Sequence, residues 1–314
     1  MIAYILRRLI AIVPLLVLIS FAVFSLTFLI PGDPARQILG PNAPASEVAQ
    51  LRHQMGLDQP YFVQYWHWLT NALRGNLGRS IQRNTSVSHE IAQRFPVTFS
   101  IALGGLAVTL LLGLPLGVVA GTRPGSKVDR LVTVGTSALL AIPDFWLAIL
   151  LILLFSVNLK VLPAIGYVPF TQSPLEWASH LCLPWIAVGV GGAATLARQL
   201  RGSLADALEQ DYVRTAEAKG VRGSVVVLKH ALKNASIAPV TILGIIFAYT
   251  LGGTVLIEYI FSIPGMGQYF YQALNSKDVP VIQGVTLLVA LIFITVNLLV
   301  DVVYAYLNPK VRLR

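Results

Sequence analysis

The chain has few charged residues, one cysteine and five histidines. Charged residues make up 12% of its 314 residues, whereas an average soluble domain carries about 25%, and the mean hydropathy is +0.71. This composition excludes an ordinary soluble domain and indicates a chain embedded in a bilayer. The cysteine, Cys182, cannot form an internal disulfide and lies in an apolar run, so we expect a small core residue there.

The usual signatures of catalysis and metal binding are also missing. No Gly-rich loop ends in Lys-Ser/Thr, so we expect no ATP hydrolysis by this chain. An intramembrane protease would need a Ser–His or paired-Asp arrangement, and Asp144 has no second aspartate at its level. His53, His67 and His89 share one segment without the spacing of a metal site. We therefore predict no catalytic residue and no metal ligand.

Six apolar segments are long enough to cross the hydrocarbon core, which takes about 20 residues. We interpret the first as a retained anchor, because it is longer than the core of a signal peptide, about 7–15 residues. The fourth is diluted by Gly189, Gly191 and Gly192, which suit close contact between helices. The predicted spans lie near residues 9–30, 97–121, 131–156, 181–197, 237–257 and 281–306.

Lysine and arginine are concentrated in alternate loops, which indicates the orientation. Cytoplasmic loops carry an excess of these residues. With the N-terminus inside, only Lys160 and Lys277 fall in the two short outer loops, and both termini are cytoplasmic. The net charge of +9 follows from this bias, so we do not expect nucleic acid as a partner. The cytoplasmic cations would be Arg7, Arg8, Arg123, Lys127, Arg130, Arg198, Arg201, Arg214, Lys219, Arg222, Lys229, Lys233, Lys310, Arg312 and Arg314.

The spans divide the chain into three parts. We predict an N-terminal anchor helix (1–31), an external segment (32–96) and a five-helix core (97–314) with a cytoplasmic loop (198–236). The external segment contains the amphipathic aromatic run YFVQYWHWL (Tyr61–Leu69). Its rings suit a cap at the membrane interface or a ligand platform, and both interpretations stay open.

The cytoplasmic loop is long, hydrophilic and basic. It contains DYVRTAEAKG (Asp211–Gly220) and then KHALKNASIAP (Lys229–Pro239). A charged segment of this length between two spans favours contact with another protein. The alternative is a basic helix that lies on anionic lipid.

Three strings, in this order, resemble those of permease subunits of ATP-binding cassette (ABC) importers, in the dipeptide, oligopeptide and nickel class. The first is YILRRL followed by a long apolar segment and PGDP, and the second is DYVRTAEAKG with LKHALKNASIAPVT. The third is FSIPGMG (Phe261–Gly267) with DVPVIQGVTLL and NLLVDVVYAYLNPKVR behind it. The resemblance covers essentially the whole chain. It implies an all-α, type I importer-like permease with six transmembrane helices in the cytoplasmic membrane of a prokaryote.

The resemblance also implies partners and an activity. The partners would be a second homologous permease subunit, two ATP-binding subunits, an extracytoplasmic binding protein and the lipid bilayer. This chain would hold no cofactor, and ATP and Mg²⁺ would bind the ATPase subunits. The implied activity is ATP-driven import of di- and oligopeptides by alternating access.

Other cargoes and another transport class remain as alternatives. Nickel, haem or another small solute is possible cargo, but no His, Cys or Met cluster lines the predicted spans, which favours peptide over nickel. An ATP-independent secondary transporter or channel is the alternative class. The loop Asp211–Pro239 separates the two, because a self-contained carrier has no need of it.

The middle string corresponds to the family's coupling motif, which is Glu-Ala-Ala, three residues and then Gly. Gly220 matches the glycine and Ala216 the second alanine, whereas Arg214 and Thr215 replace the Glu and the first Ala. The resemblance implies a helix thin enough to enter a groove on an ATPase subunit, ended by Gly220 in a left-handed conformation. The predicted coupling residues are Arg214, Thr215, Ala216, Ala218, Lys219 and Gly220.

Asp144 falls near the middle of the third predicted span, followed by Phe145 and Trp146. A carboxylate at the centre of a transmembrane helix costs about 2.5–3.5 kcal/mol on insertion scales, so it usually faces a cavity or a partner. We expect these three residues either to line the translocation path, where Asp144 would attract a cationic group, or to pair with a second permease subunit. Asp301, nearer the cytoplasmic end of the sixth span, is better explained by structural pairing.

The segment FSIPGMG follows the fifth span. Pro264 and Gly265 break the helix, and Gly267 permits another tight turn, which favours a re-entrant or interfacial bend. Glu258 lies just before it, and we expect a surface residue, either a plain one or one that contacts a docked binding protein. Together Glu258, Pro264, Gly265 and Gly267 form the predicted external gate or docking site.

Overall fold

The structure is a computed structural model that describes residues 2–29 and 32–307. Four helices in this part of the chain are long and apolar enough to cross a membrane, and the number rises to six when each of two bent pairs counts as one span. The four are α1 (Ile2–Leu29), α5 (Val87–Gly121), α8 (Pro174–Leu208) and α15 (Val279–Leu307).

One of the six predicted spans contains a sharp bend, and another begins directly after a bend. The third consists of α6 (Lys127–Ala141) and, after a bend of 95°, α7 (Asp144–Leu151) with the π-helical η1 (Ile152–Asn158). The fifth has a bend of 57° before α12 (Ile237–Gly253). The short helices that precede this bend are α10 (Gly223–Val225), η2 (Val226–Ala231) and α11 (Leu232–Ala235).

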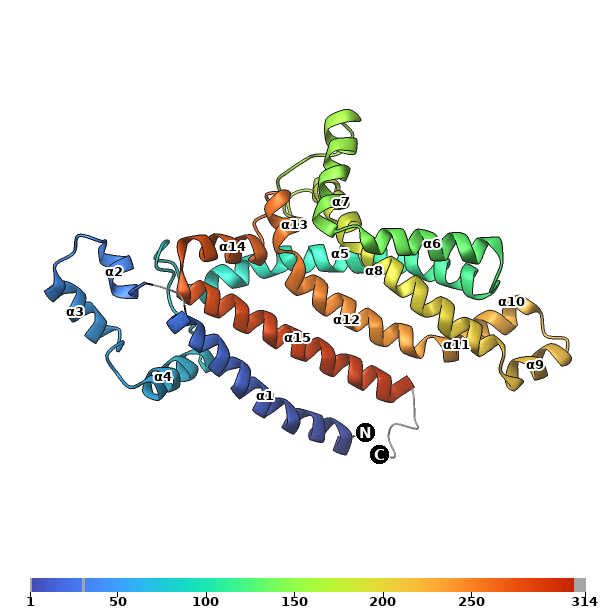
Figure 1. Cartoon of the computed structure of the whole chain (residues 1–314), viewed down its shortest axis with the longest axis horizontal. Coiled ribbons are helices and arrows are strands. Elements are labelled where there is room, and N and C mark those ends of the chain that lie inside the picture. The colour runs from blue at the N-terminus through green and yellow to red at the C-terminus, as the bar shows by residue number, and fades with distance from the viewer. Residues whose placement is uncertain (1, 30–31, 308–314) are drawn as a thin grey trace.

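The long helices run along the longest dimension of the molecule (Figure 1). The short helix α9 (Asp211–Ala218) lies at one end, and the start of α1 and the end of α15 point toward that end from nearer the middle. The helices of the external segment lie at the other end, α14 (Met266–Ser276) lies on their side of the centre, and α13 (Val255–Ile260) lies near the middle beside α7. The positive-inside bias assigns the α9 end to the cytoplasm.

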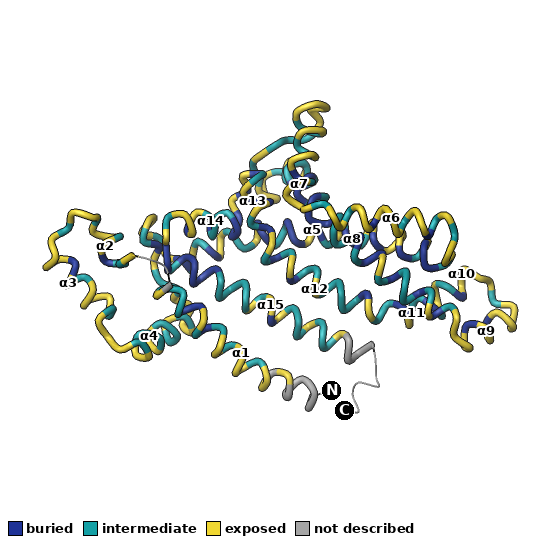
Figure 2. The backbone as a smooth tube through the Cα atoms, viewed as in Figure 1, coloured by how far each residue is buried: buried dark blue, intermediate teal, exposed yellow. Residues whose placement is uncertain are grey.

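The centre of the bundle is the contact between α5 and α8, where Figure 2 shows buried residues along both helices. Glycines allow the two backbones to approach closely. A β-carbon on Gly117 would lie 2.8 Å from the Leu200 Cβ atom, and one on Gly189 would lie 2.6 Å from the Gly105 carbonyl oxygen. Thr109 adds a hydrogen bond across the contact, from Oγ1 to the Gly189 carbonyl oxygen at 3.1 Å.

The third predicted span, over 131–156, is not one continuous helix. Pro143 disfavours helical backbone at Ile142, which is extended with ψ at 120°, so α6 ends at Ala141. A new helix begins at Asp144 and projects away from the bundle (Figure 1). A helix break followed by an acidic residue in a new first turn is the signal in the sequence that indicates this arrangement.

The external segment contains three helices, α2 (Pro34–Leu39), α3 (Ala45–Gln54) and α4 (Tyr61–Leu73). The aromatic run forms α4 and packs on α1: the hydroxyls of Tyr61 and Tyr65 are hydrogen-bonded to Ser25 and Ser20 at 2.5 and 2.8 Å. One face of α4 therefore packs against the anchor helix α1 within the same chain. Phe62 and Trp66 remain exposed on the rest of the helix.

The first and last spans are joined at both ends. Near the external end, Gln283 of α15 donates a hydrogen bond from Nε2 to the Thr27 Oγ1 atom of α1 at 2.6 Å. Near the cytoplasmic end, Arg8 and Asp301 form an ion pair with an N–O distance of 2.8 Å. Structural pairing of Asp301 is thereby confirmed, and its partner is on α1.

Candidate functional site

The cytoplasmic hairpin, defined as residues 209–235, carries the predicted coupling residues. Its helix α9 ends in a hydrogen-bond pattern of the Schellman type, with Val221 N bonded to the Ala216 carbonyl and Gly220 N bonded to the Glu217 carbonyl. Gly220 has φ of +75°, so the predicted left-handed helix end is confirmed. No atom lies within 4 Å of a β-carbon built on Gly220, so the glycine serves the backbone conformation rather than close packing.

Ala216, one of the predicted coupling residues, faces the interior of the hairpin rather than solvent. Ala216 is only 9% exposed and, with Val213, packs inward against Leu204 of α8 and Val226 of η2. The expectation that Ala216 presents a thin face to an ATPase groove is therefore wrong for this chain on its own. The three-residue spacing of Val213 and Ala216 places both on the apolar side of α9.

The opposite side of α9 is open to solvent. Arg214 makes only a long contact of 3.8 Å with the exposed Asp211. The exposed predicted coupling residues are Arg214, Thr215, Ala218, Lys219 and Gly220. They form a surface of small residues with two cations, Arg214 and Lys219, and the exposed acidic residues Asp211 and Glu217 lie on the same helix. We call this surface the α9 outer face.

Asp144 lies at the start of a helix rather than in the middle of one. Its carboxylate therefore meets the positive end of the α7 dipole, which lowers the cost that we assigned to it. A β-carbon on Gly191 of α8 would lie 3.3 Å from the Asp144 Oδ1 atom, so the carboxylate faces the glycine-rich part of α8. Phe145 and Trp146 are exposed beside it.

Glu258 is buried, which corrects the prediction of a surface residue. Its side chain is 0% exposed. Oε1 accepts hydrogen bonds from Thr98 of α5 at 2.7 Å and from Thr254 at 3.0 Å, and Oε2 accepts one from the backbone N of Gln268 at 2.9 Å. Glu258 is therefore enclosed by this chain rather than presented on its surface.

The turn Gly265–Gly267 wraps around the Glu258 carboxylate. A β-carbon on Gly265 would lie 2.5 Å from the Glu258 Cδ atom, so this position has no room for a side chain. Thr98 completes the network by accepting a hydrogen bond from Met266 N at 2.9 Å. Pro264 remains exposed at the tip of the turn, so of the four predicted gate residues it is the one that is open to a partner. Burial raises the pKa of the Glu258 carboxyl, and its hydrogen bonds act in the opposite direction.

A second buried carboxylate was missed by sequence reasoning. Asp129 of α6 accepts two hydrogen bonds from Arg201 of α8, from Nε to Oδ1 at 2.9 Å and from Nη2 to Oδ2 at 2.7 Å. Ser126 caps α6 by accepting a hydrogen bond from Asp129 N, and the pattern Ser-x-x-Asp before an apolar run was the available signal. This clamp fixes the cytoplasmic ends of α6 and α8 to each other.

A bundle of apolar spans, a close helix pair at its centre and a basic hairpin beyond the cytoplasmic end define a membrane-embedded permease. Comparisons with known proteins agree. The chain belongs to the family of binding-protein-dependent transport system inner membrane components, whose model matches residues 113–313. The N-terminal model of the same transport systems matches residues 1–102.

Curated relatives extend over the whole chain. A putative peptide transport system permease protein of Brucella abortus (strain 2308) is 41% identical over 312 residues, which cover 99% of each chain. The glutathione transport system permease protein of Salmonella typhimurium (strain LT2) shows the same identity and coverage. The chain is thus a multi-pass protein of the bacterial inner membrane, and a permease of an ABC importer.

A solved structure supports the fold independently. The MetNI methionine ABC transporter in an inward-facing conformation matches with a TM-score of 0.55 and 19% identity, covering 69% of this chain and 96% of that one. At this identity the match shows the fold alone. Permeases of this family work with ATPase and binding-protein partners, and they are not themselves catalytic.

Proposed function

We propose that this chain forms one half of a permease pair that imports short peptides. An external binding protein delivers the peptide, and two partner ATPases, which bind ATP with Mg²⁺, switch the pair between outward-open and inward-open states. The second half is a homologous permease subunit. The peptide class agrees with the names of the two relatives, one a peptide transport system permease protein and the other a glutathione transport system permease protein.

The observation that carries the proposal is the α9 outer face. It lies at the cytoplasmic end of the bundle, and no residue that the structure describes covers it. The hairpin beneath it packs on α8 through Leu204 and Ala207, so a force applied to α9 is passed to a helix at the centre of the bundle. ATP must favour one permease state over the other for transport to follow, and this contact is where that preference acts.

We also propose roles for the residues predicted to line the translocation path and for those predicted to form the external gate. Asp144, Phe145 and Trp146 line the translocation path, where Asp144 attracts a cationic group. Pro264 forms the contact with the binding protein, and Gly265 and Gly267 shape the turn that presents it. A stand-alone carrier does not need the cytoplasmic hairpin and is not favoured.

The test uses Ala218→Trp in the complete complex, reconstituted with its binding protein. We expect a bulky side chain on the α9 outer face to block the ATPase groove, so peptide uptake and stimulated ATP hydrolysis fall while insertion and expression stay normal. The matched control is Ala49→Trp, an exposed alanine on the external helix α3, which should transport normally.

Co-purification in mild detergent adds a second readout. Wild-type chain should bring down a second permease and ATPase subunits, and Ala218→Trp should retain the permease and lose the ATPases. Normal uptake by Ala218→Trp, or recovery of the wild-type chain alone under conditions that preserve other membrane complexes, would contradict the proposal.

A further inference from the structure

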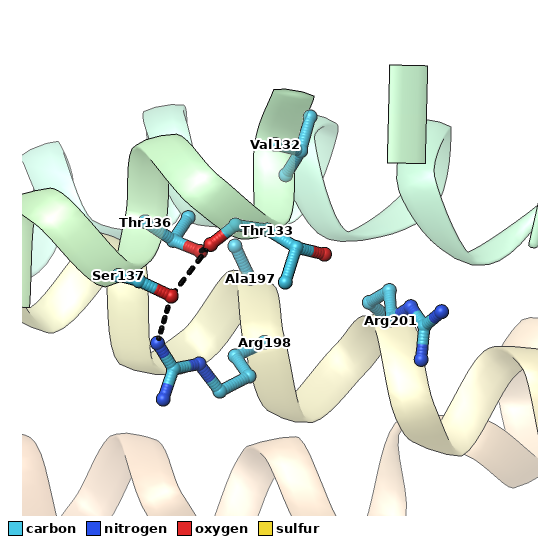
Figure 3. A pocket seen from close by; sticks show the side chains of 7 residues that line it. All are labelled: Val132, Thr133, Thr136, Ser137, Ala197, Arg198 and Arg201. Carbon is cyan, nitrogen blue, oxygen red and sulfur yellow. Dashed lines mark hydrogen bonds between the residues drawn. The ribbon is translucent and has the colours of Figure 1, made fainter. Parts of the chain in front are cut away.

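A cavity of about 320 Å³ lies between α6 and α8, on the bundle side of the Asp129–Arg201 clamp. Thr133, Thr136 and Ser137 of α6 line one wall, and Arg198 of α8 lines the other (Figure 3). The three hydroxyls already donate their hydrogens, one to the Asp129 carboxylate and two to the Thr133 carbonyl oxygen. The guanidinium group of Arg198 is therefore the group at this cavity that is suited to an anion with several oxygen atoms.

The two arginines at this cavity differ in what they already bind. Arg201 is occupied, because two of its nitrogens hold the Asp129 carboxylate. Arg198 donates one hydrogen bond, from Nη2 to the Ser137 hydroxyl at 3.0 Å, and pairs with no carboxylate among residues 2–29 and 32–307. A guanidinium group has five donors in a fork that matches a carboxylate, so most of the Arg198 donors are free for a ligand.

The Arg198 guanidinium group and the Asp144 carboxylate lie along the same side of α8. The Asp144 carboxylate rests against Gly191, and Gly191 precedes Arg198 by seven residues on the straight part of α8. Seven residues complete two helical turns to within about 20°, so Gly191 and Arg198 lie on the same side of α8, with an axial rise of about 10 Å. The Asp144 carboxylate therefore lies beside the same side of α8 from which Arg198 projects, and the backbone of Arg198 is about 10 Å further along the helix axis toward the cytoplasm.

We propose that Arg198 is the binding site for the carboxylate terminus of the imported peptide, with Asp144 facing its amino terminus. This inference rests on the proposed function, since it names the part of the peptide that the permease holds. The backbone positions of Gly191 and Arg198 are about 10 Å apart along the helix axis, which is about the length of three extended residues at 3.3–3.6 Å each. The ligand is a short zwitterionic peptide with both termini free.

A lipid phosphate would satisfy the same donors, so the experiment separates the two sources of anion. Val132 lines the cavity without polar contacts and provides a reporter position, Val132→Cys, in a Cys182→Ser background. The rate of modification by an anionic and by a cationic methanethiosulfonate reagent is measured on the complete reconstituted complex. The measurement is repeated with a free tripeptide, with its C-terminal amide, and in vesicles with and without anionic phospholipid.

We expect the free tripeptide to slow modification during turnover and the amide to protect about tenfold less, because an arginine–carboxylate hydrogen bond is stronger than one to a neutral group. Arg198→Gln should remove this difference and lower the anionic-to-cationic rate ratio, and Arg198→Lys should restore part of both. The control Arg130→Gln removes an exposed cation from α6, away from the cavity, and should change neither.

Equal protection by the acid and the amide, or protection that follows anionic lipid in the absence of peptide, would overturn the assignment. Uptake by the unmodified complex separates this failure from a failure of the proposed function. A complex that imports no peptide contradicts the proposed function itself. A complex that imports peptides, but whose preference for a free carboxylate survives Arg198→Gln, contradicts only the role of Arg198.

Discussion

At the scale of single residues, Glu258 shows how one side chain holds three elements together. Its carboxylate joins Thr98 of α5, Thr254 at the start of α13 and the backbone of α14. Burying such a group is costly unless its oxygens are hydrogen-bonded, and here both oxygens have donors. The glycine turn and the carboxylate are therefore mutually dependent.

The raised pKa of Glu258 predicts a pH dependence of stability. Because the folded pKa lies above the ordinary value of 4.5, the stabilising contribution is fully present below pH 4.5 and is lost as pH rises through the folded value. We expect the apparent Tm of the wild-type chain in detergent to fall, relative to that of Glu258→Gln, over this window. Glutamine does not titrate, so a difference that stays constant or grows in favour of wild type with rising pH would contradict the prediction.

Gly220 supports a prediction about backbone conformation alone. Gly220→Ala should destabilise the cytoplasmic hairpin by about 1–2 kcal/mol, because a left-handed conformation is unfavourable for a residue with a β-carbon. Hydrogen exchange of the hairpin amides measures the change. Gly223→Ala is the matched control, since Gly223 has open space around it and no positive φ. An equal effect of both substitutions would argue against the conformational explanation.

At the scale of helices, the α5–α8 contact depends on small residues at the points of closest approach. Gly117→Leu would place a side chain where even a β-carbon lies 2.8 Å from Leu200. We expect the two helices to separate and the apparent Tm to fall, with a loss in the range of a severe overpacking, about 1–3 kcal/mol or more. Thermal unfolding in detergent measures this loss.

Gly135 provides the comparison for that prediction. It lies in α6, and no atom is within 4 Å of its built β-carbon. Gly135→Leu should leave the Tm unchanged or raise it slightly, because leucine is the better helix former. A similar loss for both variants would show that the bilayer-facing surface, rather than the helix contact, is sensitive to added volume.

The positions of the long helices are predictable from the sequence, whereas helix breaks and the burial of side chains near helix ends are less so. Apolar length alone places the spans, because a bilayer requires some 20 apolar residues wherever a helix crosses it. The break before Asp144 depends on one proline, and a hydropathy window averages over it. The inward packing of Ala216 depends on a cluster to which Val226 and Leu204 of neighbouring elements contribute. The burial of Glu258 depends on Thr98, which lies 160 residues away in the chain and leaves no local pattern.

In the coupling segment, too, local features are predictable from the sequence and tertiary packing is not. Its helix and its glycine end are local features, so a single motif predicts both. Which side of α9 faces outward is decided by the hydrophobic cluster under the hairpin, to which α8 and η2 contribute. The exposed Ala218, rather than the buried Ala216, is therefore the position that reports on docking.

At the scale of the whole molecule, the charge distribution predicts which end faces the cytoplasm. In a Cys182→Ser background, Gln54→Cys on α3 should react with a membrane-impermeant maleimide in intact cells with a permeable outer envelope. Lys219→Cys at the end of α9 should react only after the inner membrane is opened, because the positive-inside rule places it in the cytoplasm. Labelling of Lys219→Cys from outside would reverse the orientation and remove the basis for coupling.

The hydrogen bonds that tie the two ends of the chain together have a consequence for biogenesis. Gln283 reaches back 259 residues to the Phe24 carbonyl, and Asp278 reaches back 198 residues to the Ser80 hydroxyl. At a synthesis rate of about 5–20 residues per second, α1 waits on the order of 10–50 s for its partner to leave the ribosome. Throughout that interval the polar groups of α1 that serve α15 have only lipid or transient neighbours. The Phe24 carbonyl and the Thr27 hydroxyl of α1, which bind Gln283, are thus satisfied only late in synthesis, although α4 is available to pack on α1 much earlier.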